Sequence, residues 1–150
     1  MSRLLMGLFG LALLAVPAQA ADYYGYGNTG YTGTPYQSGL HRLPICDEPK
    51  VLSKVTGQLA IYDANIIGTG QRVESFDGIR ETKVDVGGPG LIPRRYCGAT
   101  AYLTGGQTTE VVYLIEFQAG LASIHWNVEA CLPGRDPYRV YGSWCRSIRP

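Results

Sequence analysis

The sequence lacks the closely spaced cysteine and histidine pairs that bind metals. It has only two histidines, His41 and His125. The four cysteines lie far apart, at Cys46, Cys97, Cys131 and Cys145. Structural zinc sites use ligand pairs a few residues apart, and covalent haem requires a Cys-x-x-Cys-His motif, which is absent. We therefore expect no metal and no cofactor.

Beyond residue 20, the sequence has neither a net charge nor a long apolar run. The 13 lysines and arginines include Arg3, and the other 12 match 12 acidic residues, so residues 21–150 carry no net formal charge. Nucleic-acid-binding domains are usually basic, so we expect no nucleic-acid partner. A membrane-spanning helix needs about 20 apolar residues, so we expect no membrane span after the first twenty residues.

The first twenty residues have the three parts of a secretory signal peptide. Arg3 precedes an apolar run over 4–16, and Ala18-Gln19-Ala20 offers a cleavage site. The run is too short for a membrane anchor, which needs about 20 residues. The pattern predicts a signal peptide at 1–20 and a protein that is periplasmic or secreted.

Residues 21–40 are dominated by Gly, Tyr, Thr and Ser and contain no Val, Ile or Phe. Such a composition buries too little apolar surface to offset the entropy lost on ordering. We interpret this stretch as a flexible Gly/Tyr-rich tether. Residues 41–150 are then long enough for a single domain with one core.

Apolar spacing predicts one helix followed by a sheet. A stripe of apolar residues recurs at helical spacing after Asp47, a candidate cap, and before an end near Asp63: Val51, Leu52, Val55, Leu59 and Tyr62. Strands are expected at about 73–86, 93–103, 108–118 and 122–132, with the first broken or bulged at Asp77-Gly78. The predicted fold class is α+β: an N-terminal helix packed on a curved antiparallel sheet of about four strands.

Strand alternation then separates two faces of the sheet. If Leu103 faces Thr108 and Gln118 faces Ala122, one face is nearly all apolar and includes Cys97. The other face is aromatic and polar, and we take it as a candidate binding face. Its members are Arg94, Tyr96, Tyr102, Tyr113, His125, Asn127 and Glu129. A slip of one residue would exchange the two sets.

An even number of cysteines in an exported protein predicts two disulfides. Cys97 and Cys131 fall on opposite faces of the predicted sheet, so they should not pair with each other. We favour Cys46–Cys97 with Cys131–Cys145, because Cys46 precedes the helix that covers the Cys97 face. Cys46–Cys131 with Cys97–Cys145 is the alternative.

The polar residues do not form a recognisable catalytic set. His125 and Glu129 would lie about 13 Å apart along a strand, and no activated nucleophile accompanies them. We therefore name no catalytic residue, and an enzyme acting on envelope glycan or peptide is the least favoured hypothesis. The first hypothesis is a non-enzymatic envelope protein that binds an unknown envelope protein or glycan. The second is an inhibitor of a cell-wall hydrolase that acts through loop 132–144, with Arg135, Tyr138 and Arg139 as candidate contacts.

Three segments carry a resemblance to known sequences: RRYCGATAYLTGG, VVYLIEF and HWNVEACLPGRDPYRVYGSWCR. They resemble an uncharacterised family of small exported, cysteine-containing proteins of Gram-negative bacteria. The similarity covers about 43–149 and is most specific around Cys131 and Cys145. The resemblance implies an envelope location and paired cysteines, and it implies no catalytic residue.

Overall fold

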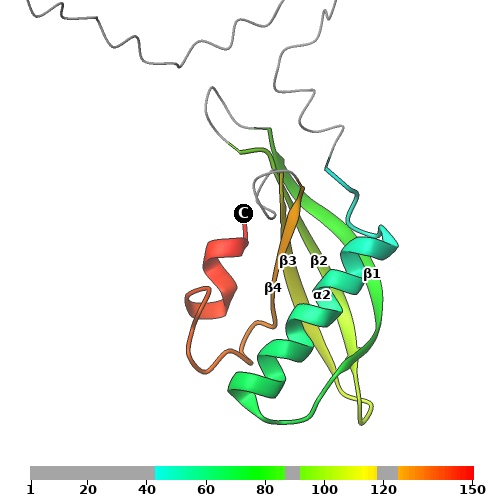
Figure 1. The fold of residues 1–150 in the computed structure, drawn as a ribbon, viewed down its shortest axis with the longest axis vertical. Helices are drawn as coiled ribbons and strands as arrows, with labels where there is room; N and C mark the ends of the chain where they lie inside the picture. Colours follow the sequence, from blue (N-terminus) through cyan, green and yellow to red (C-terminus); the bar gives the residue numbers. More distant parts are fainter. Residues whose placement is uncertain (1–42, 87–91, 118–124) are drawn as a thin grey trace, which may run out of the picture. The chain divides into compact units, whose positions relative to one another are not determined.

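The computed structural model describes residues 43–86, 92–117 and 125–150 (Figure 1). The predicted signal peptide and tether lie outside these residues. The elements, in chain order, are helix α2 (Pro49–Tyr62), the π-helical turn η1 (Asp63–Ile67), strands β1 (Val73–Asp85), β2 (Arg94–Leu103), β3 (Thr108–Glu116) and β4 (Asn127–Cys131), and the 3-10 segment η3 (Ser143–Ile148). Among the described residues, no helix is both long and apolar enough to cross a membrane.

Helix α2 begins differently from the sequence prediction. Glu48, and not Asp47, is the N-cap residue, and no side chain caps the helix. Pro49 occupies the first turn, where its missing N–H costs nothing. Of the predicted stripe, Val51, Val55 and Leu59 are buried, whereas Leu52 and Tyr62 are half-buried.

The four strands form one antiparallel sheet in the order β1-β2-β3-β4. Figure 1 shows α2 crossing one face of this sheet. The predicted bulge in β1 is confirmed, because the pairing with β2 shifts between Asp77 and Arg80, around Gly78 with φ 59°. Two further shifts occur along the same strand, and each increases the local twist of this edge strand.

The expected register of β3 was wrong by one residue. Leu103 donates its N–H to the carbonyl of Gln107, and Tyr102 pairs with Thr108, so the hairpin loop has three residues where four were assumed. Gly105 and Gly106 both have positive φ, which lets this tight turn form. The shift turns every β3 side chain to the face opposite the expected one.

The expected register between β3 and β4 was also wrong. Glu116 pairs with Asn127, a shift of three residues from the assumed pairing of Gln118 with Ala122. Both shifts are by an odd number of residues, so each one reverses the expected face. The two reversals cancel for β4. The faces expected for β2 and β4 are therefore correct, and the face expected for β3 is wrong.

The main core lies between α2 and the sheet. The stripe of α2 packs on alternate residues of strands β2, β3 and β4. These residues are Cys97, Ala99, Ala101 and Leu103 of β2, Val111, Tyr113 and Ile115 of β3, and Val128 and Ala130 of β4.

A second, smaller core lies on the opposite face of the sheet, for which the sequence analysis predicted no covering element. There the C-terminal residues Cys145 and Ile148 pack on Tyr96, Val112 and Leu114. The C-terminal segment therefore forms a third layer over part of the sheet.

Both favoured disulfides are present. Cys46–Cys97 has a Cα–Cα distance of 5.8 Å and joins the start of α2 to the helix-facing side of β2. Cys131–Cys145 has a Cα–Cα distance of 6.0 Å and joins β4 to the C-terminal layer. The α+β prediction with two disulfides is confirmed. Such disulfides are typical of proteins that fold outside the reducing cytoplasm.

Candidate functional site

The structure divides the predicted binding face. Arg94, Tyr96, Asn127 and Glu129 lie on the face opposite α2, as expected from strand alternation. Tyr113 does not: it is 0 % exposed in the main core, because of the one-residue shift of β3. Its hydroxyl donates to the carbonyl oxygen of Cys46 at 2.8 Å, and burial raises the pKa of that hydroxyl.

Tyr102 lies away from the remaining members of this face, and His125 lies outside the strand. Tyr102 is exposed at the hairpin end of β2, eight residues and about 27 Å along the strand from Arg94. His125 is exposed at a bend before β4, so its expected place within a strand was wrong. The candidate face is therefore not one continuous surface.

Among the polar residues that stay together on this face, Arg94 already has a charged partner. Arg94 donates to Glu116 at 2.7 Å, one strand away. The pKa of Glu129 is raised, chiefly by partial burial and also by the negative charge of Glu116. Tyr96, two residues after Arg94 on the same face of β2, is buried. This arrangement offers a paired ion group and little exposed aromatic surface for a partner.

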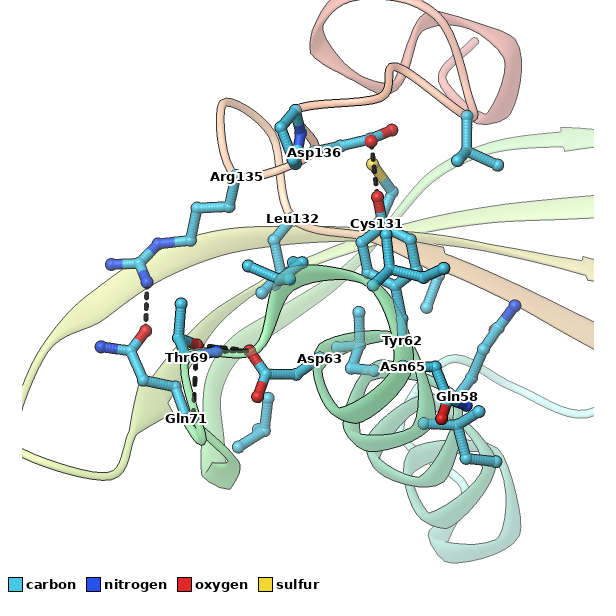
Figure 2. Close-up of a pocket in the computed structure, with 18 of the residues that line it drawn as sticks. Gln58, Tyr62, Asp63, Asn65, Thr69, Gln71, Cys131, Leu132, Arg135 and Asp136 are labelled. Atoms are coloured by element: carbon cyan, nitrogen blue, oxygen red, sulfur yellow. Dashed lines mark hydrogen bonds between the residues drawn. The ribbon is translucent and has the colours of Figure 1, made fainter.

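A cleft lies elsewhere, between the C-terminal end of α2 with η1 and the loop that follows β4 (Figure 2). Its volume is about 670 Å³, which is within the range of ligand pockets. Most of its lining surface is apolar, and its aliphatic residues include Leu59, Ile67, Val73, Leu103, Ala130 and Leu132. Neither His125 nor Glu129 lines it.

Two pairs of polar side chains connect α2 to the loop at one side of the cleft. Tyr62 donates its hydroxyl to Asp136 Oδ1 at 2.6 Å, as Figure 2 shows. Burial, and then this bond to Asp136, raise the pKa of Tyr62 to about 12, so the hydroxyl keeps its proton at neutral pH. Gln58 donates to the Tyr141 hydroxyl at 3.2 Å. These contacts hold the loop against the helix.

A second polar group stands at the other side of the cleft. Arg135 donates one guanidinium N–H to Gln71 and another to Gln107 at 2.8 Å. Gln71 also donates to Gln107 at 3.1 Å. The three side chains come from the loop, the segment before β1 and the β2–β3 hairpin, so this triangle joins three separate parts of the chain.

The floor of the cleft depends on a turn built around Asp63. Gly68, with φ 74°, ends the π-helical turn in the left-handed region that suits glycine. The buried Asp63 carboxylate accepts hydrogen bonds from the Thr69 hydroxyl and from the backbone N–H of Gly70 at 2.7 Å. These bonds lower the pKa of Asp63 despite its burial, and the bond from the Thr69 hydroxyl has the largest effect.

Replacing this carboxylate tests its role in the turn. Asp63→Asn should reduce the free energy of unfolding by about 1 kcal/mol at pH 7, since charge-assisted hydrogen bonds are lost. The folded-state pKa of Asp63 lies below its unfolded value, so the stabilisation is full above about pH 4 and disappears as the pH falls through the folded-state pKa. The difference between wild type and Asp63→Asn in urea unfolding should therefore shrink in acid. Asp77→Asn, on an exposed residue, is the control.

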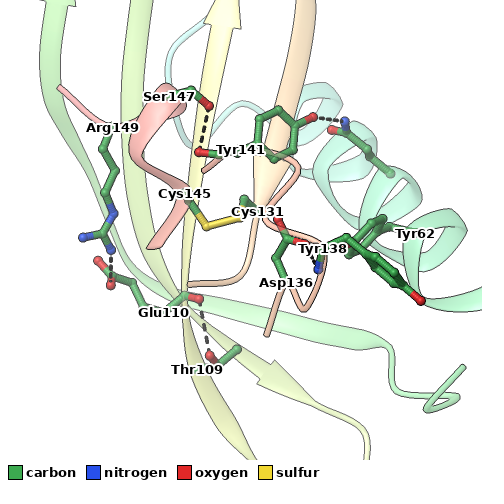
Figure 3. The surroundings of a disulfide bond; sticks show 11 residues. Tyr62, Thr109, Glu110, Cys131, Asp136, Tyr138, Tyr141, Cys145, Ser147 and Arg149 are labelled. Carbon is green, nitrogen blue, oxygen red and sulfur yellow. Dashed lines mark hydrogen bonds and ion pairs between the residues drawn. A yellow bond between two sulfur atoms is a disulfide. The ribbon is translucent and has the colours of Figure 1, made fainter. Parts of the chain in front are cut away.

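The loop that walls the cleft is held at both ends. Cys131–Cys145 closes it, and Figure 3 shows Tyr141 and Ser147 bonded beside the disulfide. Asp136 Oδ1 accepts the backbone N–H of Tyr138 at 3.1 Å, which forms a turn typical of Asp. Gly134 has φ 77°, and a Cβ there would lie 3.4 Å from the Trp144 ring, so a glycine fits best.

Loop 132–144 exposes several large side chains. Tyr138 is 69 % exposed, Val140 60 % and Trp144 70 %. Of the three candidate contacts predicted in this loop, Tyr138 and Arg139 are exposed, while Arg135 is half-buried at the cleft. Within the described residues, Arg139 forms no ion pair.

Comparisons with protein-family models, with curated proteins and with solved structures find no match to this chain. The resemblance to a family of exported proteins stays a prediction. The functional conclusions below therefore rest on the geometry of the loop and the cleft.

Proposed function

We propose that this is a non-enzymatic exported protein, periplasmic or secreted, that binds an envelope protein through loop 132–144. The observation that carries the proposal is the exposure of Tyr138, Val140 and Trp144 on one loop. Large apolar side chains grouped on a surface mark interaction sites. Tyrosine, tryptophan and arginine are also the residues that contribute most to protein–protein binding energy.

The loop also meets the condition for tight binding by a short segment. It is tied by the disulfide, by the bond of Tyr62 to Asp136 and by a bond from the Gly142 N–H to the Arg139 carbonyl at 2.8 Å. A segment that is ordered before binding loses less conformational entropy when a partner docks. Exposed Arg139 and Arg146 favour a partner surface with acidic groups.

An affinity pull-down from the native cells tests this proposal. Tyr138→Ser with Trp144→Asn should reduce capture of the partner by at least about tenfold, because hot-spot residues cost 2 kcal/mol or more. Asparagine suits position 144 because Trp144 has φ 57°, and asparagine tolerates this left-handed conformation.

The matched control is Ile45→Ser with Ile92→Asn, which removes two exposed apolar residues outside the loop. Melting temperatures should show that both variants are folded. Equal capture by the loop variant and the control variant would contradict the proposal. Capture of a glycan fraction in place of a protein would contradict the partner class.

A cell-wall hydrolase is a second candidate for the partner, with the loop as an inhibitor. The observation that favours it is the same anchored loop with a protruding Tyr138, because a rigid projecting segment fits an active-site cleft. Residual activity of purified lysozymes should fall at micromolar protein and recover with Tyr138→Ser. Full activity at that concentration would exclude lysozymes as targets.

A further inference from the structure

The cleft beside loop 132–144 combines a mainly apolar lining with the cation of Arg135. Its lining surface is mainly apolar and includes nine Leu, Ile, Val and Ala residues, of which Ile61 and Ile66 are exposed at the edge. Exposed aliphatic residues beside an aliphatic cavity cost solvation free energy unless they contact something apolar. The cavity volume of about 670 Å³ is suited to a small molecule with an apolar body.

Arg135 supplies the charge at the cleft. Its guanidinium bonds only the neutral amides of Gln71 and Gln107, and no carboxylate among the described residues forms an ion pair with it. A guanidinium carries five N–H donors, and these bonds use two of them. The amides orient the group, and its planar shape matches a carboxylate or a phosphate.

The two carboxylates that line the cleft bond residues other than Arg135, and Asp136 Oδ2 has no hydrogen-bond partner within the described residues. Both oxygens of Asp63 accept hydrogen bonds from the turn that follows η1. Asp136 points toward Tyr62, on the side away from the Arg135 guanidinium (Figure 2). The charge beside the Gln71–Gln107 pair is therefore positive.

We infer that the cleft is a binding site for an anionic single-chain amphiphile, with its alkyl chain on the aliphatic lining and its head group at Arg135. The head group is a carboxylate or a phosphate, the two anions that arginine binds through paired N–H donors. This site shares Val140 with the exposed surface of loop 132–144 but includes neither Tyr138 nor Trp144, and it does not depend on a protein partner.

Titration of the purified full chain with dodecyl compounds below their micelle concentrations tests the site. Dodecanoate and dodecyl phosphate should each bind saturably with one molecule per chain, and the tighter of the two identifies the natural head group. Dodecyltrimethylammonium should bind at least about tenfold more weakly, because its head group is repelled by Arg135.

Variants separate the head-group contact from the chain contact. Arg135→Gln should weaken dodecanoate binding about tenfold and leave dodecanol binding unchanged, since only charge-assisted hydrogen bonds are lost. Arg139→Gln, in the same loop but outside the lining, is the matched control. Ile61→Gln with Ile66→Gln should weaken both ligands, and Ile45→Gln with Ile92→Gln should weaken neither.

Three outcomes would overturn the inference. They are no saturable binding of either anion, binding of the ammonium compound as tight as that of dodecanoate, and unchanged dodecanoate affinity in Arg135→Gln. Melting temperatures establish that each variant is folded. Loss of partner capture in the Tyr138 and Trp144 variant, with amphiphile binding retained, would distinguish this site from the proposed function.

Discussion

Replacing Cys46 and Cys97 together with alanine is expected to lower the free energy of unfolding by about 4 kcal/mol. The bond joins positions 51 residues apart, and its removal frees a long loop in the unfolded chain. It also releases the start of α2 from β2, at the edge of the main core. Urea unfolding followed by circular dichroism measures the effect.

The second disulfide provides the matched comparison. Cys131 and Cys145 are 14 residues apart, so their replacement should cost about 3 kcal/mol, less than the first pair. That variant should also lose partner capture, because the loop is no longer closed. A larger loss of stability from the second pair than from the first would contradict the chain-entropy argument.

The largest effect expected from a single substitution is at Tyr113. Tyr113→Ala should cost about 4 kcal/mol, because it leaves a large cavity beneath α2. Tyr113→Phe keeps the ring and should cost about 1–2 kcal/mol, since the Cys46 carbonyl loses its buried donor. Denaturant titration of both variants separates the packing contribution from the hydrogen bond.

Tyr102→Ala is the control for the strand register. Tyr102 is exposed on the face opposite Tyr113, so its replacement should change stability by no more than about 0.5 kcal/mol. If Tyr113→Ala proved as mild as Tyr102→Ala, Tyr113 would face solvent. The register of β2 with β3 would then be wrong.

The helix and the strands could be predicted because their signals are local. The stripe of Val51, Val55 and Leu59 specifies one buried helix face, and Asp77-Gly78 marks the bulge of β1. The disulfide pairing was predicted from strand alternation, which places Cys97 of β2 and Cys131 of β4 on opposite faces of the sheet. These faces were correct because the two register errors, of one and three residues, each reversed a face and so cancelled.

The face of β3 could not be predicted from its residues. Val111, Val112, Tyr113, Leu114 and Ile115 are all apolar, so alternation carries no signal on this strand. The backbone of the turn at Gly105 and Gly106 decides the register, and either a three-residue or a four-residue loop suits those glycines. The same error placed Tyr113 on a binding face when it belongs to the core.

The cleft was not predicted at all, although Arg135 was recognised as a candidate contact. Arg135 meets Gln71 across 64 positions of sequence, and Tyr62 meets Asp136 across 74. No local pattern marks two glutamines or one tyrosine as partners of a distant loop. The sequence by itself determined the α+β elements and the closed C-terminal loop, because periodicity and cysteine pairing are written along the chain. Only the tertiary structure decided which surfaces are exposed and where the cleft lies, because those depend on contacts between segments that the chain brings together after folding.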